Sequence, residues 1–555
     1  MTKKNFFKLT CAFTMFSIIF LACGAPTELT YTPKQINPLP KNEEEKIYNI
    51  SPMTTAVMPS QTQKESAAAV EMPKDALAPA PLQSNQPLNP PNQEPYWDNY
   101  FKNYGINPFI DTEDDHFSTF ALDVDTGSYV ITRRYINDGN LPPNDAVRVE
   151  EFVNYFEQGY DYPSKGKPFA IYVDGAPTQF TESEQYRILR IGIQGYAVPK
   201  EERKDASLVF VIDVSGSMDL ENRLELVKDS LKLLVKQLTE NDSVAIVIYG
   251  TDARVLLEPT SADQDNAILE AIYSLYPEGS TNAQAGLDLG YHMALKAFKP
   301  NGINRVILCS DGVANVGDTG ADEIWDTIKA KASEGITLTT IGFGMGNYND
   351  VLMEQLANQG NGFYTYVDSL NEAKKIFIEN LTSTLQVIGL EAKLQVEFNP
   401  EVVSRYRLVG FENRAIADED FRDDKVDAGE IGAGHSVTAL YEIKLHPKAE
   451  GKIATVFLRW KDPETQETSE LQQNFSSEDF ETTFRDASPY FQRDVLIAEF
   501  AEVLRGSYWA QNSSFDAILE TTESMQKDFD DDEEWGGFIE LVEKANHTQT
   551  RVEEE

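Results

Sequence analysis

The sequence predicts an α/β protein built on a doubly wound, mostly parallel sheet, with β-rich regions on both sides and a helical carboxyl-terminal segment. Between residues 201 and 385, short apolar runs alternate with amphipathic helical stripes, which is typical of strands joined by parallel crossovers. In residues 117–196 and 387–480, apolar and polar residues roughly alternate, which predicts strands with one solvated face. Beyond residue 480, apolar residues recur at helical spacing.

The amino terminus has the pattern of an export signal. Three lysines within the first eight residues precede an apolar run at residues 9–21, which is shorter than the roughly 20 residues a membrane span needs. The run ends in Ala22-Cys23-Gly24, which resembles a bacterial lipoprotein signal, although Phe20 and Leu21 depart from its usual residues. The resemblance implies a signal peptide over residues 1–22 and a diacylglyceryl group on Cys23. The alternative is a secreted protein that is cleaved nearby.

Residues 23–94 form a predicted tether. They are rich in Pro, Gln, Asn, Ser, Thr and Ala and nearly free of aromatic residues, so they bury too little apolar surface to offset their ordering entropy. Together with the lipid on Cys23, the tether predicts a protein of the cell envelope, anchored to a membrane and extracytoplasmic, in the periplasm or at the cell surface.

Charge and cysteine content limit the partners and the disulfide bonds that the chain can have. The chain has 48 basic and 90 acidic residues, a net charge of -42, which argues against nucleic acid as a partner and favours solubility. Of its three cysteines, Cys11 lies in the signal and Cys23 is the predicted lipid site. Only Cys309 remains, so no intramolecular disulfide is expected, and its place after an apolar run predicts a buried thiol.

An amino-terminal α+β domain is expected at residues 95–200. Its predicted strands lie at residues 117–125, 169–173 and 186–193, and its predicted helix at residues 149–158.

The central unit is expected at residues 201–385. Its predicted strands are residues 208–214, 244–249, 255–257, 305–309, 337–343 and 362–366. Its predicted helices are residues 222–238, 267–275, 283–298, 322–333, 350–358 and 370–380.

A β-rich domain at residues 386–480 and a helical segment at residues 481–555 complete the chain. The β-rich regions before and after the central unit could pack together as one sandwich with that unit inserted, since insertion is tolerated where termini lie close together.

Three loops of the central unit carry oxygen ligands. Asp213-Val214-Ser215-Gly216-Ser217 follows the first strand, Thr281 precedes an alanine-rich helix, and Asp311 follows the strand that ends in Cys309. In a doubly wound sheet, ligands bind beyond the carboxyl ends of the strands, so these side chains should meet. Two carboxylates and three hydroxyls suit a hard divalent cation such as Mg²⁺, with Ca²⁺ or Mn²⁺ as alternatives.

This set resembles the metal-ion-dependent adhesion site of the von Willebrand factor type A family, over about residues 205–385. The resemblance implies that Ser215, Ser217 and Thr281 contact the metal directly. It implies that Asp213 and Asp311 act mostly through waters. It also implies that a carboxylate from a partner's Asp or Glu completes the site.

The flanking segments resemble bacterial YfbK-like lipoproteins with such a domain. The similar stretches are residues 120–129 and 141–156 before the central unit and residues 495–505 after it.

Other motifs give weak indications of a protease, a zinc site or a calcium site. Asp125-Thr126-Gly127-Ser128 and Asp318-Thr319-Gly320 match the aspartic-protease fragment, but glycine turns in two different domains are the favoured interpretation. The five histidines lack zinc-ligand spacing. The acidic run at residues 528–534 lacks the glycine of a calcium loop, so a solvated turn is favoured.

The sequence therefore predicts a membrane-anchored binding protein, not an enzyme, that binds a protein partner through a divalent metal. One alternative is an envelope scaffold whose metal only stabilises loops. The other is an envelope hydrolase.

Overall fold

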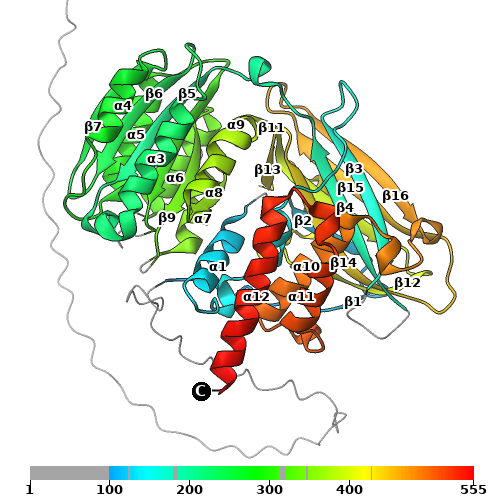
Figure 1. Cartoon of the computed structure of the whole chain (residues 1–555). Helices are drawn as coiled ribbons and strands as arrows, with labels where there is room; N and C mark the ends of the chain where they lie inside the picture. The colour runs from blue at the N-terminus through cyan, green and yellow to red at the C-terminus, as the bar shows by residue number, and fades with distance from the viewer. Residues whose placement is uncertain are drawn as a thin grey trace, which may run out of the picture. The chain divides into compact units, whose positions relative to one another are not determined.

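The computed structural model describes residues 99–554, apart from residues 123–124, 179–184, 313–320, 346–347 and 427. The expected signal peptide (1–22), the lipid site Cys23 and the tether (23–94) lie outside the described residues. Those described belong to one compact unit, drawn in colour in Figure 1. Within this part of the chain, no helix is both long enough and apolar enough to cross a membrane.

The central unit is a six-stranded sheet in the order β10-β9-β8-β5-β6-β7. Its strands are β5 (Ala206–Asp213), β6 (Ser243–Tyr249), β7 (Ala253–Ser261), β8 (Ile303–Ser310), β9 (Thr337–Phe343) and β10 (Tyr364–Val367). All neighbours run parallel except β7, which pairs antiparallel with β6 at one edge. The predicted doubly wound, mostly parallel sheet is confirmed.

Helices cover both faces of this sheet (Figure 1). They are α3 (Arg223–Val235), α4 (Asp265–Tyr273), α5 (Ala283–Lys296), α6 (Ala321–Ser333), α7 (Asp350–Gln359), α8 (Leu370–Lys374) and α9 (Leu381–Leu385). Alternate residues of β5 point to opposite faces, so Val209 and Val211 share a core with α5, whereas Leu208 and Phe210 share one with α3. Burial on both faces explains why this strand is a continuous apolar run.

Two further sheets form a sandwich. One has the order β1-β12-β14-β4-β3, and the other has the order β13-β11-β15-β16, with β2 added on β11. The strands that precede the central unit are β1 (Ile110–Asp111), β2 (Phe117–Ala121), β3 (Phe169–Pro177) and β4 (Tyr186–Gly195). Those that follow it are β11 (Val387–Phe398), β12 (Val403–Val409), β13 (Gly429–Gly432), β14 (Ser436–Leu445), β15 (Lys452–Lys461) and β16 (Thr468–Ser476).

Strands from before and after the central unit pair directly in both sheets. Ile191 of β4 lies opposite Ala439 of β14, and Phe120 of β2 lies opposite Leu394 of β11. The inner faces of the two sheets share one apolar core. Residues 95–200 and 386–480 therefore contribute to the same sheets, and the central unit is inserted between β4 and β11.

A helical layer covers the outer face of the sheet β1-β12-β14-β4-β3. α10 (Pro489–Leu504) packs its apolar residues against that face, where Arg190 Nη1 donates to Asp494 Oδ2 at 2.8 Å and Arg407 Nη1 to Glu502 Oε2 at 3.1 Å. The helices α1 (Gly127–Asn137), α2 (Val149–Val153), α11 (Phe515–Ser524) and α12 (Glu533–Glu554) pack with α10 and with one another. The predicted helical carboxyl-terminal segment is confirmed.

Two predicted helices differ from the observed ones. α2 ends at Val153 rather than residue 158, because the Asn154 side chain donates to the Glu150 carbonyl at 2.8 Å and to the Thr438 carbonyl at 3.0 Å. The expected helix at residues 370–380 is instead α8, a π-helical turn η5 (Lys375–Glu379) and α9.

Candidate metal centre

The predicted metal ligands lie at the carboxyl edge of the central sheet. Asp213 is the last residue of β5 and Asp311 follows the last residue of β8. β5 and β8 are adjacent and parallel, so their ends meet at this edge. Ser215 and Ser217 lie in the turn that leads from β5 into η4 (Gly216–Asn222), a 3-10 helix.

Short contacts hold the first loop around Asp213. Asp213 Oδ1 accepts from the Ser215 backbone N–H at 2.8 Å, and Asp213 Oδ2 accepts from the Ser310 hydroxyl at 3.1 Å. The hydroxyls of Ser215 and Ser217 are 3.0 Å apart. Both carboxylate oxygens and both hydroxyls are thus gathered in one turn.

The loop that carries Thr281 is held against the serine loop by backbone contact. The Gly216 N–H donates to the Gly279 carbonyl at 3.2 Å, two residues before Thr281. Gly279 has a φ of +78°, and an added Cβ would lie 2.6 Å from Thr251 Oγ1, so the turn requires glycine. Thr281 itself is half-buried.

Asp311 is paired with an arginine that sequence reasoning missed. Arg223 Nη1 donates to Asp311 Oδ2 at 3.0 Å, and Arg223 Nη2 donates to the Met345 carbonyl. Arg223 is the first residue of α3, where the helix dipole disfavours a positive charge. A cation at this position of the sequence indicates that a nearby negative charge stabilises it. An added Cβ on Gly344 would lie 2.2 Å from Arg223 Nε, so the arginine needs glycine beside it.

The centre has an excess of buried negative charge. Burial, followed by the nearby Asp311 carboxylate, raises the pKa of Asp213 to about 7. Asp311 Oδ1 is buried and has no hydrogen-bond partner among the described residues. A buried carboxylate oxygen of this kind normally has a partner, and a divalent cation is one that suits it.

The donor set fits a hard divalent cation. Two carboxylates and three hydroxyls offer oxygen atoms only, which Mg²⁺ and Ca²⁺ prefer. In the part of the chain that the structure describes, no group of three or more His, Cys, Asp or Glu side chains is arranged to hold a metal. This centre has two acidic residues, so its metal would depend on the serine and threonine hydroxyls.

Ser217 and Thr281 are the more exposed residues of the centre. Asp213, Ser215 and Asp311 are buried, whereas Ser217 is half-buried. Two large apolar side chains close to the centre in the sequence are exposed: Leu220, three residues after Ser217, is 47% exposed, and Tyr276, three residues before Gly279, is 57% exposed.

The aspartic-protease fragment has a structural role. Asp125 Oδ1 accepts from the Tyr364 backbone N–H at 3.0 Å, and Asp125 Oδ2 accepts from Arg414 Nη2 at 2.7 Å. Asp125 thereby ties the start of α1 to β10 of the central sheet. The second copy, at residues 318–320, lies outside the described residues.

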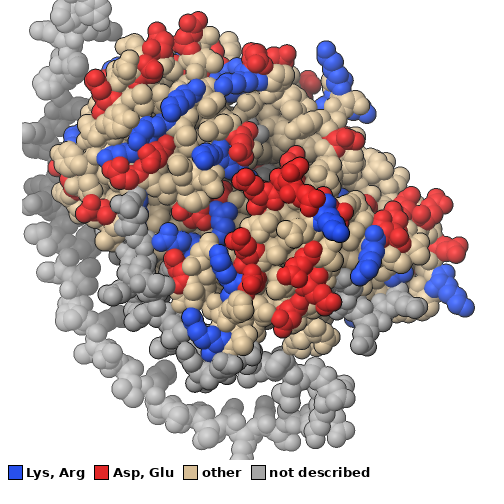
Figure 2. Space-filling view, viewed as in Figure 1, with Lys and Arg blue, Asp and Glu red and all other residues tan. Residues whose placement is uncertain are grey.

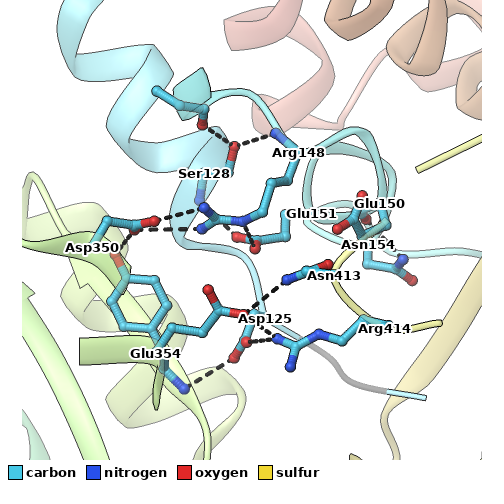
Figure 3. Close-up of polar contacts among 12 residues, drawn as sticks. Asp125, Ser128, Arg148, Glu150, Glu151, Asn154, Asp350, Glu354, Asn413 and Arg414 are labelled. Atoms are coloured by element: carbon cyan, nitrogen blue, oxygen red, sulfur yellow. Dashed lines mark hydrogen bonds and ion pairs between the residues drawn. The ribbon is translucent and has the colours of Figure 1, made fainter. Parts of the chain in front are cut away.

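Figure 3 shows the polar network around this contact. Arg148 pairs with Glu151, and its Nη1 donates to Asp350 Oδ2 at 2.6 Å. Arg414 Nη2 likewise donates to Glu354 Oε1 at 2.6 Å. Asp350 and Glu354 belong to α7, so arginines from the flanking regions bind carboxylates of the inserted unit.

The acidic run at residues 528–534 lies where α12 begins, and Figure 2 shows acidic side chains gathered there. Asp532 Oδ1 accepts from the backbone N–H groups of Glu534 at 2.9 Å and Trp535 at 3.0 Å, so it caps the helix. Cys309 is buried as predicted, and burial raises the pKa of its thiol.

Three stretches of the chain match known families. Residues 207–379 match the von Willebrand factor type A domain, and residues 95–189 match a second family described as von Willebrand factor. Residues 383–452 and 444–548 match the carboxyl-terminal region of the protein YfbK.

Comparisons with individual proteins agree with these matches. The chain is 38% identical over 472 residues to YfbK of Escherichia coli (strain K12), covering 80% of this chain and 81% of that protein. It is 27% identical over 263 residues to human inter-alpha-trypsin inhibitor heavy chain H3, covering 43% of this chain and 28% of that protein.

Among solved structures, a von Willebrand factor type A protein from Catenulispora acidiphila is similar with a TM-score of 0.40 and 16% identity, covering 68% of this chain and 84% of that one. The ArnB paralog VWA2 from Sulfolobus acidocaldarius has a TM-score of 0.34 and 15% identity, covering 69% of this chain and 98% of that one.

Proposed function

The chain belongs to the YfbK family of proteins with a von Willebrand factor type A domain, and from that premise we propose that it captures a protein partner through a divalent cation at its metal centre. Type A domains are typically protein-interaction modules, and they commonly bind a divalent metal. The observation that carries the proposal is the buried pair Asp213 and Asp311, with one oxygen of Asp311 lacking a hydrogen-bond partner.

The residues of the centre would have two different roles in metal binding. Ser215, Ser217 and Thr281 would contact the metal directly, and Asp213 and Asp311 would balance its charge. A bound Mg²⁺, Ca²⁺ or Mn²⁺ supplies positive charge that attracts a carboxylate from an Asp or Glu of the partner. Arg223 keeps Asp311 in place, and Ser310 keeps Asp213 in place, so both carboxylates are preorganised.

Exposed apolar side chains near the centre support a protein as the partner. Leu220 and Tyr276 lie on the two loops that the Gly216–Gly279 hydrogen bond joins. Tyrosine is enriched among interaction hot spots, so Tyr276 is the stronger anchor of the two. The partner surface would therefore place an acidic residue among apolar ones.

The proposed setting is the cell envelope. Lipidation at Cys23 would anchor the chain to a membrane, and the segment up to residue 94 would hold the metal centre away from it, in the periplasm or at the cell surface. Labelling of intact cells with a radioactive fatty acid checks this part, since Cys23→Ser should abolish the label.

The decisive experiment is crosslinking in intact cells with and without a chelator, followed by identification of the proteins lost. Under the proposal, chelation and Asp213→Ala both abolish capture of the same partner. Capture that survives both changes would instead support a scaffold whose metal only stabilises loops. Turnover of peptide or ester substrates by the purified protein would favour the hydrolase alternative.

A further inference from the structure

A cavity of about 200 Å³ lies between α10 and the outer face of the sheet β1-β12-β14-β4-β3, and no residue of the metal centre lines it. Part of its lining is apolar and buried: Leu440 on β14 and Val495 on α10 are each 3% exposed. Two lining residues that follow α10 are exposed, Asn512 and Trp509. Solvent therefore reaches the cavity beside the segment that follows α10.

Aromatic rings form one wall of this cavity. The ring of Phe109 meets the ring of Trp509 edge to face, with centroids 5.0 Å apart, and that of Tyr186 at 5.8 Å. The Trp509 indole is held by its Nε1, which donates to the Asn107 carbonyl at 3.1 Å. Aromatic faces attract positive charge, and the Arg407 guanidinium already lies 5.5 Å from the Trp509 ring centroid. The wall thus favours cations over anions.

Three carboxylates line the cavity, and one lining arginine pairs with two of them. Arg407 Nη1 donates to Glu502 Oε2 at 3.1 Å, and Arg407 Nη2 donates to Glu442 Oε2 at 3.2 Å. The third carboxylate, Glu499, forms no ion pair with a described residue. Burial, then the charges of Glu502 and Glu442, raises the pKa of Glu499 to about 8. An additional positive charge in the cavity would relieve this repulsion.

One oxygen of Glu499 is free to accept from a ligand. The Ser513 hydroxyl donates to Oε1, and no described residue donates to Oε2. Glu499 is half-buried and lines the cavity, and Oε2 is not among the buried polar atoms that lack a partner, so solvent reaches it. Water or a ligand in the cavity can therefore donate to this oxygen.

We propose that this cavity binds a small primary amine in its ammonium form, with a short apolar chain. The ammonium group donates to Glu499 Oε2 beside the ring of Trp509, and the chain lies on the apolar lining at Leu440 and Val495. An apolar cavity of about 150 Å³ holds benzene, whereas drug-sized ligands need about 300 Å³ or more, so one ring or a chain of a few carbons fits.

Other small ligands match the cavity less well. An anion would face three carboxylates, of which Glu499 has no arginine to neutralise it. A hard metal ion needs about six oxygen ligands, and the aromatic and apolar lining offers none. A neutral apolar molecule would cover the same lining but leave Glu499 Oε2 without a donor.

Thermal unfolding of the full chain at about pH 8.5 tests the proposal. At this pH Glu499 is mostly ionised, and an alkylammonium group, like that of lysine with a pKa of about 10.4, is still protonated. The probes n-butylamine, n-butanol and sodium butyrate have similar chains and differ in charge. Each would be added at up to about 20 mM at constant ionic strength, and we expect a saturable rise in unfolding temperature with n-butylamine alone. Equal stabilisation by n-butanol would overturn the proposal.

Glu499→Gln removes the charge but keeps the shape, and it should weaken n-butylamine binding at least tenfold, which corresponds to about 1.4 kcal/mol. Glu523→Gln, at an exposed residue of α11, is the matched control and should bind as the wild type does. Unchanged binding by the Glu499 variant would place the amine elsewhere and overturn the proposal. If that variant fails to fold, the wild type still decides: no saturable stabilisation by ethylamine, n-butylamine, n-hexylamine or benzylamine would overturn it as well.

Discussion

Two groups of buried carboxylates in this chain differ in what neutralises them. Where the inserted unit meets the flanking regions, Asp350 and Glu151 are bound by Arg148, with each side chain nearly excluded from water. At the metal centre, Arg223 pairs with one oxygen of Asp311, and Asp213 is held by a hydroxyl and a backbone N–H. The carboxylates of the first group are neutralised by an arginine of the chain, whereas those of the second group have more negative charge than the chain neutralises.

Buried carboxylates thus hold two regions together in one place and favour binding of a cation in another. A buried ion pair joins two regions because separating its members leaves charges unpaired. Two carboxylates without a sufficient positive charge do not hold two regions together, but they favour the binding of a cation from solution.

Arg148→Met should destabilise the protein by about 3–5 kcal/mol, because Asp350 and Glu151 would stay buried without their cation. Urea unfolding of the purified chain measures the loss. Arg422→Met is the control: Arg422 is 58% exposed and pairs with Glu470 on the surface, so its removal should cost at most about 1 kcal/mol. Similar losses for both variants would contradict the contrast.

Asp213→Asn should leave the metal-free protein as stable as the wild type or more so, because it removes a buried charge that Asp311 repels. It should also abolish stabilisation by Mg²⁺, which for the wild type is about 2.7 kcal/mol at 100 times the dissociation constant. Calorimetric unfolding with and without MgCl₂ measures both. Asp219→Asn, an exposed neighbour in η4, should keep the full Mg²⁺ response.

Glu499 is a carboxylate with neither an arginine partner of its own nor a metal. Burial, then the charges of Glu502 and Glu442, raises its pKa to about 8, and the Ser513 hydroxyl donates to it. Because the folded pKa lies above the unfolded value, its contribution is fully present below the unfolded pKa of 4.5 and is lost as the pH rises through about 8.

Glu499→Gln should therefore be more stable than the wild type at about pH 9, by about 1–3 kcal/mol relative to the difference at about pH 4. Urea unfolding at the two pH values measures this. The exposed Glu523→Gln should show the same pH dependence as the wild type. A wild-type profile in the Glu499 variant would show that this carboxyl is as well solvated as a surface one.

Leu220→Ser and Tyr276→Ser should change stability by no more than about 0.5 kcal/mol, because both side chains are exposed. Both should nevertheless weaken partner capture in the crosslinking experiment without reducing Mg²⁺ stabilisation. Phe298→Ser, at an exposed apolar residue after α5, is the control. Undiminished capture by the Leu220 and Tyr276 variants would mean that the partner contacts the metal centre without these anchors.

Much of the fold could be predicted because its signals are local. The apolar runs of β5, β6, β8 and β9 identify strands buried on both faces, and the turn residues after β5 identify the metal loop. Parallel strands also bring their carboxyl ends together, so the sequence alone predicts that Asp213 and Asp311 lie at one edge.

The contacts that could not be predicted from the sequence join residues that are far apart in the chain. Arg148 and Asp350 are separated by 202 positions, and Arg223 and Asp311 by 88. Nothing in the local sequence of either arginine names its partner. The early end of α2 has the same origin, since Asn154 donates to the Thr438 carbonyl of β14, which follows the inserted unit in the sequence.

The insertion between β4 and β11 has a mechanical consequence. The inserted unit is joined to the sandwich by two covalent connections, one before β5 and one in which a single residue separates α9 from β11. A load applied at the metal centre would thus be divided between two strands of polypeptide in parallel. It would arrive at β4 and β11, each locked between neighbours in a different sheet, so that no single backbone hydrogen bond at an edge has to carry it alone.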